Sequence, residues 1–192
     1  YYLGNAVLKD TPSPQLSFVA QAAKHGVPIF VSSPGDSSIG MNLSYLKLLG
    51  EGIIIDTDLD VLQSTAIVFQ SKKNGVVSIG GGSPKNFYMQ TQPTLAQILD
   101  INKGGHDYFI QITTDAPQWG GLSGATPSEA ISWGKVKKEE MKNHVVVYSD
   151  ATIAMPILAG YILSERKPRK KKHLYDGLTD AVADLKKRVK QR

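Results

Sequence analysis

The stretch VVSIGGG, residues 76–82, indicates the fold, because a short apolar run rich in β-branched side chains leads directly into three glycines. A run of this kind is typical of a buried strand, and glycine permits a tight turn after it. Residues 108–112 and 145–148 repeat the pattern, and each is followed by a polar loop. Segments with helical spacing separate the three runs, so the sequence predicts parallel strands joined by helices.

Two further apolar runs, residues 27–31 and 52–55, are also interpreted as buried strands. No helix or strand is assigned to the polar and aromatic stretch at residues 83–92. The expected fold is therefore α/β, a three-layer Rossmann-like parallel sheet with helices on both faces. The chain opens at Tyr1 without an initiating methionine, so we expect an incomplete domain that lacks its N-terminal part. Helices are expected at residues 14–26, 41–49, 57–72, 93–101, 127–133, 152–163 and 175–189.

Composition and charge divide the chain into two parts. With 192 residues, 41% of them hydrophobic and 20% charged, the chain is typical of a globular protein. Residues 164–192 carry 11 Lys or Arg against 4 Asp or Glu, whereas residues 1–163 carry 11 against 13. We expect an α/β domain over residues 1–163 and a basic, partly helical tail over residues 164–192. The tail is interpreted as a solvated extension, because it lacks the interleaved aromatic residues that stack on bases.

Several classes of protein are not indicated. There is no cysteine, so disulfides and thiol chemistry are excluded. No apolar run reaches the length of a membrane span, and a cytoplasmic location is expected. No metal site is expected, because the four histidines show no ligand spacing with one another. They are His25, His106, His144 and His173.

The segment ATPSEAISWGK, residues 125–135, carries the strongest chemical signal. Proline suits the first turn of a helix, so Glu129 and Trp133 are expected on one helical face. Gly134 can then end the helix and place Lys135 in a turn. An amine beside an indole loses water, which favours its neutral, nucleophilic form. These residues predict an imine-forming lysine, although a cap, a packed aromatic ring and a solvated charge would show the same spacing.

The loops that follow the predicted strands should meet at one edge of the sheet, where ligands of open α/β sheets bind. The glycine triplet Gly80–Gly82 allows a close approach of a phosphate or a nicotinamide to the backbone. Asp36 and Asp150 could accept hydrogen bonds from a ribose or an amide. A plain turn and two helix caps are the alternative interpretation.

The segment 125–135 resembles the active-site signature of the deoxyhypusine synthase family, Pro-x-Glu-Ala-x-Ser-Trp-Gly-Lys. Four loops are similar, in order and spacing, to those that hold NAD in that family. The resemblance runs from about Leu16 to Leu163 and corresponds to the C-terminal half or so of the family's fold. It implies NAD as cofactor, a polyamine substrate and a homotetramer. The four loops are residues 34–38, 80–82, 113–115 and 148–151.

The resemblance also implies roles for individual residues. Lys135 would carry an aminobutyl group as an imine, Glu129 would steer a cationic nitrogen, and Trp133 would pack against methylene groups. NAD contacts are implied at Asp36, Gly81, Thr114, Asp115, Asp150 and Ala151, and substrate contacts at Asn86, Gly120, Gly121, Glu129 and Trp133. Residues 1–163 would then be the NAD-binding domain.

Three positions depart from the family pattern. Asn86 stands where the family has a histidine, and Met41 and Leu122 stand where it has two aspartates that engage spermidine. The loss of two carboxylates weakens the attraction for a trication. We therefore predict NAD-dependent aminobutyl transfer from an altered donor, such as putrescine or agmatine, to an acceptor amine. The acceptor is expected to be a free amine, although a lysine of a translation factor is the other possibility.

Two other functions are kept open. The chain could be a catalytically silent NAD-binding subunit that regulates an active paralogue. The basic tail could also bind nucleic acid, a function for which the sequence gives little support.

Overall fold

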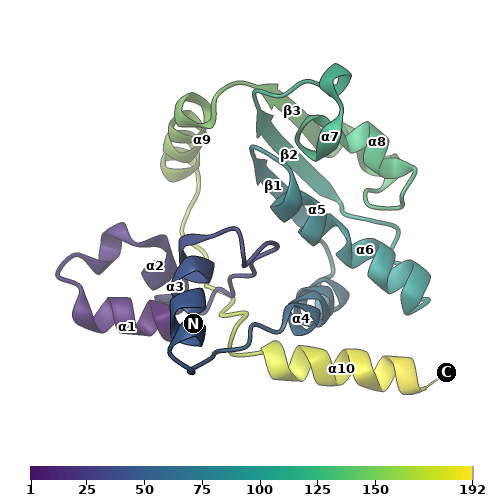
Figure 1. Cartoon of the computed structure of the whole chain (residues 1–192). Coiled ribbons are helices and arrows are strands. Elements are labelled where there is room, and N and C mark those ends of the chain that lie inside the picture. Colours follow the sequence, from purple (N-terminus) through teal and green to yellow (C-terminus); the bar gives the residue numbers. More distant parts are fainter. Residues whose placement is uncertain (192) are drawn as a thin grey trace. The chain divides into compact units, whose positions relative to one another are not determined.

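The computed structural model describes residues 1–191, and these form two compact units. One unit comprises residues 31–166, and the other combines residues 1–30 with the segment that begins at Lys167 (Figure 1). Residues 1–30 thus belong with the tail rather than with the sheet. The assignment of NAD binding to residues 1–163 stays a prediction.

The larger unit is built on a three-stranded parallel sheet in the order β1-β2-β3. Its strands are β1 (Gly75–Ile79), β2 (Tyr108–Thr113) and β3 (His144–Tyr148), so the three apolar runs are strands as predicted. Ile79 pairs with Ile112, and Thr113 pairs with Tyr148. The carboxyl ends of the strands therefore lie at one edge of the sheet.

Helices cover both faces of this sheet, which confirms the predicted α/β class (Figure 1). On one face, Phe109 of β2 packs with Met89 of α5 (Ser83–Met89) and with Val136, which follows α8 (Pro127–Ile131). On the other face, α9 (Ala151–Glu165) lies over β2 and β3 across an apolar cleft lined by Ile110, Val145, Ile153 and Ile157, among others. Burial of apolar side chains on both faces supplies most of the stabilisation of such a layered unit.

The remaining elements of this unit connect the strands. The longest, α4, begins where the sequence predicts, because the Asp56 carboxylate accepts a hydrogen bond of 2.8 Å from the Leu59 N–H group. Next to α5 lie the short α6 and a π-helical turn, η2. The elements are α3 (Ser38–Leu48), α4 (Thr57–Gln70), α6 (Thr91–Pro93), η2 (Thr94–Ile98), η3 (Pro117–Trp119), α7 (Gly121–Gly124) and η4 (Lys138–Asn143).

Two sequence-based assignments are wrong, and one helix was not predicted. Residues 27–31 and 52–55 are not strands: no other segment of the described chain pairs with them, and an extended segment becomes a strand only with a hydrogen-bonded neighbour. Ile54 is accordingly 87% exposed. The stretch 83–92, to which no helix was assigned, begins with α5, and its Pro84 lies in the first helical turn.

The smaller unit is helical. It contains α1 (Tyr2–Asp10), η1 (Pro14–Leu16), α2 (Phe18–Lys24) and α10 (Leu178–Lys190), which is the predicted helix of the tail. Gly4 lets α1 approach α2 closely, because a side chain there would collide with Ala23 and with the Val19 carbonyl. The Tyr1 and Tyr175 rings stack with centroids 4.0 Å apart, which joins the two ends of this unit.

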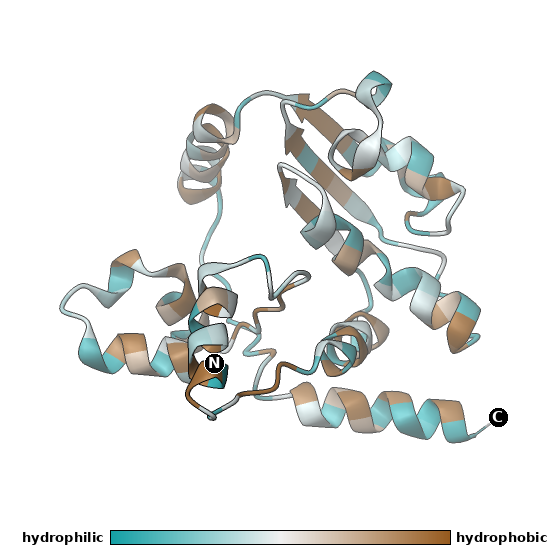
Figure 2. Cartoon of the chain, in the orientation of Figure 1, coloured by the Kyte–Doolittle hydropathy of each residue, from teal (hydrophilic) through white to brown (hydrophobic). Residues whose placement is uncertain are grey.

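Apolar side chains are widely exposed in the larger unit. Figure 2 shows apolar residues along the strands and along α9, a helix that buries none of its residues. Among residues 1–191, no helix combines the length and the apolar character that crossing a membrane requires.

Candidate active site

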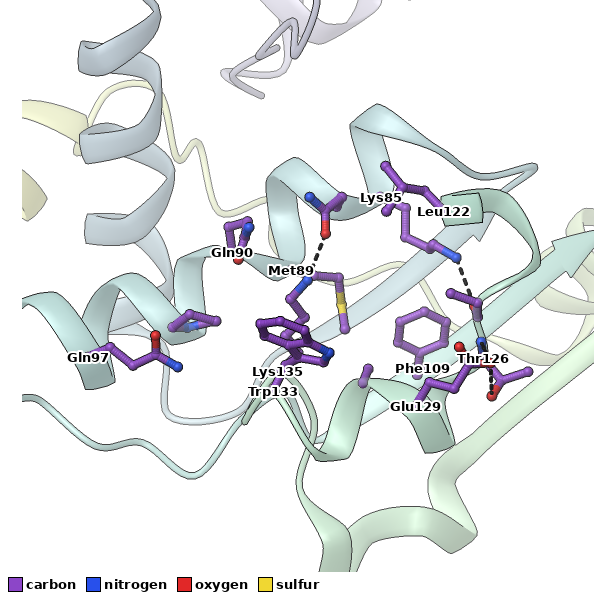
Figure 3. A pocket seen from close by; sticks show the side chains of 14 residues that line it. Lys85, Met89, Gln90, Gln97, Phe109, Leu122, Thr126, Glu129, Trp133 and Lys135 are labelled. Atoms are coloured by element: carbon purple, nitrogen blue, oxygen red, sulfur yellow. Dashed lines mark hydrogen bonds between the residues drawn. The ribbon is translucent and has the colours of Figure 1, made fainter. Parts of the chain in front are cut away.

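A half-open pocket of about 480 Å³ lies between α5 and α8, over Phe109 of β2 (Figure 3). Its residues come from elements far apart in the sequence, including η2 and α7. The four predicted site residues that it brings together are Asn86, Glu129, Trp133 and Lys135.

Local hydrogen bonds place Lys135 at this pocket. Gly134 has a φ of 65°, in the left-handed region. The Gly134 N–H donates to the Ile131 carbonyl at 2.9 Å, and the Lys135 N–H donates to the Ala130 carbonyl at 3.0 Å. This is a Schellman motif, in which the left-handed residue is usually glycine. Gly134 thus ends the helix and turns Lys135 toward the pocket, as its position in the sequence predicts.

The start of β2 fixes the backbone of the segment that carries Lys135. The His106 N–H donates to the Lys135 carbonyl at 3.0 Å, and the Lys137 N–H donates to the His106 carbonyl at 3.1 Å. These bonds form a parallel bridge between His106 and Val136, which are both buried. The lysine therefore projects from a segment that is attached to the sheet.

The Lys135 amine has a neutral partner. Its Nζ donates a hydrogen bond of 2.7 Å to Asn86 Oδ1 and lies 5.9 Å from the centroid of the Trp133 ring. Burial lowers the pKa of Lys135 below its ordinary value. An amide oxygen orients the amine without adding the negative charge that would hold its proton. The geometry thus favours a nucleophilic amine.

Glu129 lies at the first turn of α8, and its Oε1 accepts hydrogen bonds from the N–H and the hydroxyl of Thr126, at 3.2 and 3.3 Å. This is a capping arrangement, so the alternative interpretation of Glu129 as a helix cap is correct in part. Its carboxylate is nevertheless exposed and lines the pocket. Glu129 can therefore attract a cation at this end.

A second lysine, Lys85, was missed by sequence reasoning. Its Nζ donates to the Ala125 carbonyl at 2.9 Å, which connects α5 to the loop before α8. Burial, opposed by the nearby Glu129 carboxylate, lowers the pKa of Lys85. The sequence offers one signal, its position three residues after the glycine triplet. Gln90, Gln97 and Phe109 also line the pocket and carry no comparable signal.

Three of the four predicted cofactor loops, at residues 80–82, 113–115 and 148–151, lie at the carboxyl edge of the sheet. Gly80 and Gly82 have φ values of 75° and 89°, and open space faces the position of a side chain at both. Gly81 instead packs against Ser123, whose hydroxyl donates to Asp115. Left-handed glycine backbone with open space beside it is suited to the close approach of a cofactor.

Asp150 lies at the end of β3 and caps α9. Its Oδ1 accepts hydrogen bonds from the Thr152 N–H at 2.8 Å and from the Thr152 hydroxyl at 2.6 Å. These bonds lower the pKa of Asp150. Ala151 is the first residue of the helix. The capping interpretation of Asp150 is therefore correct, and its exposed Oδ2 has no hydrogen bond within residues 1–191.

The other predicted residues do not line the pocket. Gly120 and Gly121 precede Leu122, which does line it, and both have positive φ values with open space around them. Thr114 is exposed beyond β2. Asp36 is exposed in the loop before α3, and this loop reaches the start of α5 through a contact of 3.1 Å between the Ser33 and Ser83 hydroxyls. Within the described part of the chain, no group of acidic residues and histidines is arranged to hold a metal ion.

A family model described as deoxyhypusine synthase matches residues 2–162. The chain belongs to the deoxyhypusine synthase family. A deoxyhypusine synthase-like protein of Nostoc punctiforme is 50% identical over 162 residues, which are 82% of this chain and 42% of that protein. One from Thermosynechococcus vestitus is 47% identical over 195 residues, 96% of this chain and 49% of that protein.

A third relative, probable deoxyhypusine synthase 2 of Methanosarcina acetivorans, is 51% identical over 143 residues. These are 74% of this chain and 41% of the relative. The chain thus spans less than half the length of the three relatives. The roles of the site residues stay predictions.

Proposed function

We propose that the protein transfers an aminobutyl group from an amine donor to an acceptor amine, with NAD as cofactor and an imine on Lys135 as the intermediate. The observation that carries the proposal is the Lys135 amine. It lies in a pocket beside an indole, its pKa is lowered by burial, and its hydrogen-bond partner is a neutral amide. Membership of the deoxyhypusine synthase family supports a transferase of this class.

The open glycine backbone at the carboxyl edge of the sheet fits a dinucleotide. NAD would supply the oxidation of the donor by accepting a hydride, and would return it at the end of the transfer. The residues proposed to hold it are Asp36, Gly81, Thr114, Asp115, Asp150 and Ala151. The free Oδ2 of Asp150 is the acceptor best placed for a hydroxyl or an amide.

The side chains of the pocket would prepare and capture the donor. Glu129 attracts the distant ammonium of the donor, and Trp133 packs against its methylene groups and offers a cation–π face. The neutral Lys135 amine then adds to the imine carbon of the oxidised donor and a C=N bond to Nζ forms, while the bond to the leaving nitrogen breaks and that nitrogen departs as a neutral amine with the two protons of the Lys135 amine. Asn86 orients Lys135 Nζ throughout. Gly120 and Gly121 are proposed to pass close to the substrate.

The pocket favours a donor with little charge. Glu129 is its only carboxylate among the described residues, whereas Asn86, Gln90 and Gln97 are neutral amides. Leu122 is apolar at the same end as Glu129 (Figure 3). An ammonium without a partner costs several kcal/mol to desolvate, so a trication would be disfavoured. Putrescine or agmatine is the proposed donor, and a free amine the proposed acceptor.

The full-length protein should be incubated with NAD and labelled putrescine, agmatine or spermidine, and then treated with borohydride. We expect a stable adduct at Lys135 with putrescine or agmatine, and none in Lys135→Ala. The absence of any adduct would contradict the proposed function. Ready aminobutyl transfer from spermidine to a lysine of a translation factor would contradict only the altered donor.

A silent regulatory subunit is the alternative function, and it has no use for a partly buried, oriented amine at position 135. The same borohydride experiment separates the two functions. We further propose a cytoplasmic homotetramer, which the exposed apolar surface of the larger unit supports.

A further inference from the structure

The pocket continues on both sides of Lys135. In Figure 3, Gln90 and Gln97 lie on one side of the pair formed by Lys135 and Trp133, and Glu129 and Leu122 lie on the other. An intermediate on Lys135 Nζ therefore has two ends of the pocket within reach. We call them the glutamine end and the glutamate end.

The two ends differ in chemistry. The glutamate end carries a carboxylate, Glu129, and the Lys85 amine held by the Ala125 carbonyl. The glutamine end carries two exposed amides and no charged group from residues 1–191 apart from Lys135 itself. Within those residues, neither the Gln90 amide nor the Gln97 amide has a hydrogen-bond partner. Both side-chain amides can therefore form hydrogen bonds with a ligand.

The backbone at the glutamine end is unusual. Gln90 caps the C-terminus of α5, and Gln97 projects from η2, a π-helical turn of five residues (Thr94–Ile98). π-Helical turns are rare and are frequently found at functional sites. Pro93, which immediately precedes the turn, also lines the pocket. The turn thus brings Gln97 to the same wall as Gln90.

We propose that the glutamine end binds the acceptor amine, while the glutamate end binds the charged end of the donor. This rests on the proposed function. The acceptor nitrogen must be neutral to attack, and an amide oxygen accepts its N–H group without stabilising the ammonium as a carboxylate would. A small primary amine, such as an alkyl diamine, has the size and the chemistry for this end.

The step at the glutamine end is an exchange of imines. The acceptor nitrogen attacks the imine carbon held by Lys135, a C=N bond to the acceptor forms, and the bond to Lys135 Nζ breaks. The two protons of the acceptor amine pass to Lys135 Nζ, which leaves as a free amine. No electrons are gained or lost in this exchange, and the bound cofactor would supply the hydride for the later reduction of the new imine.

The test separates adduct formation from transfer in the full-length protein. The adduct is formed with NAD and labelled putrescine and measured by borohydride trapping. Transfer is measured as the rate at which label passes to added 1,3-diaminopropane. Gln97→Leu preserves the size of an exposed side chain, and Gln15→Leu, an exposed glutamine in η1, is the matched control.

We expect Gln97→Leu to form the adduct normally and to transfer the label about tenfold more slowly, with a raised KM for the acceptor, because one hydrogen bond is lost. Glu129→Gln should show the reverse, with slow adduct formation, and Gln15→Leu should change neither step. Normal transfer by Gln97→Leu, or a loss of its adduct, would overturn the assignment. Absence of the adduct in the wild-type protein would instead show that the proposed function fails.

Discussion

At the scale of single residues, Asn86 is the immediate partner of the Lys135 amine, with Nζ and Oδ1 2.7 Å apart. Replacing the amide by a carboxylate places a negative charge beside the amine and raises its pKa. Asn86→Asp should therefore slow formation of the Lys135 adduct at pH 8, and the rate should recover as the pH rises. One unit of pKa changes the neutral fraction of an amine about tenfold. The measurement is the pH profile of borohydride trapping.

Asn86→Ala is the control for this prediction, because it removes the hydrogen bond and adds no charge. It should slow the reaction at every pH without moving the profile. If Asn86→Asp and Asn86→Ala had the same profile, the amide would not influence the protonation of Lys135.

The local part of the site could be predicted from sequence, since Glu129, Trp133 and Lys135 lie within seven residues and Gly134 forms the turn between them. The rest could not. Lys85, Gln97 and Phe109 belong to other elements, and only the packing of α5, η2 and β2 around the pocket brings them together.

At the scale of elements, Lys103 holds the C-terminus of α4. Its Nζ donates to the carbonyls of Val68, Phe69 and Ser71, at 3.0, 2.6 and 2.5 Å, at the end of the helix where carbonyls run out of helical partners; the Val68 carbonyl also accepts from the Ser71 N–H group at 3.2 Å. Lys103→Met should lower the free energy of unfolding by about 2 kcal/mol, the usual value of hydrogen bonds to a charged group. Urea unfolding measures it. Lys72→Met, at an exposed lysine, is the control and should have little effect.

The junction between β2 and the Lys135 segment should make stability depend on pH. His106 is buried, stacks on Tyr88 and donates from Nδ1 to Asn74 Oδ1, and burial lowers its pKa to about 4. In the unfolded chain its pKa is near 6.5, so only the unfolded state takes up a proton between these values. The contribution of His106 to the free energy of unfolding is therefore fully present above pH 6.5 and decreases as the pH falls toward 4.

Through His106, the free energy of unfolding should fall by about 2 kcal/mol between pH 7 and pH 4.5. Urea unfolding at both pH values measures it, with His106→Phe as the comparison. The variant should show a smaller difference between the two pH values, whatever its absolute stability. An equal difference in both proteins would mean that His106 does not titrate between these pH values.

A helix or strand could be predicted from sequence where the residues of that segment alone determine it. Three strands follow from short β-branched runs, and α4 follows from Asp56 at its start. Residues 27–31 and 52–55 have the same composition but no pairing partner in the described chain, which the sequence of the segment cannot reveal. The helix α5 could have been predicted from Pro84 in its first turn, a signal obscured by the polar and aromatic residues that follow.

At the scale of the whole molecule, the larger unit leaves apolar surface uncovered. Ile153, Ile157 and Leu163 of α9 are 61%, 69% and 82% exposed, and β1 has no strand from residues 1–191 on its outer side. Apolar surface on this scale is typical of an interface. We therefore expect the chain of residues 1–192 to self-associate and to bind a hydrophobic dye.

Substituting single positions of α9 tests whether this helix is responsible. Ile157→Asp places a charge on its apolar surface and should shift the isolated chain toward smaller species in sedimentation experiments, with less dye bound. Ser164→Asp adds the same charge at an exposed polar position of the helix and should change neither property. If both variants associate as the unmodified chain does, the surface that drives association lies outside α9. The exposed residues Ile53 and Ile54, which precede α4, are then the next positions to substitute.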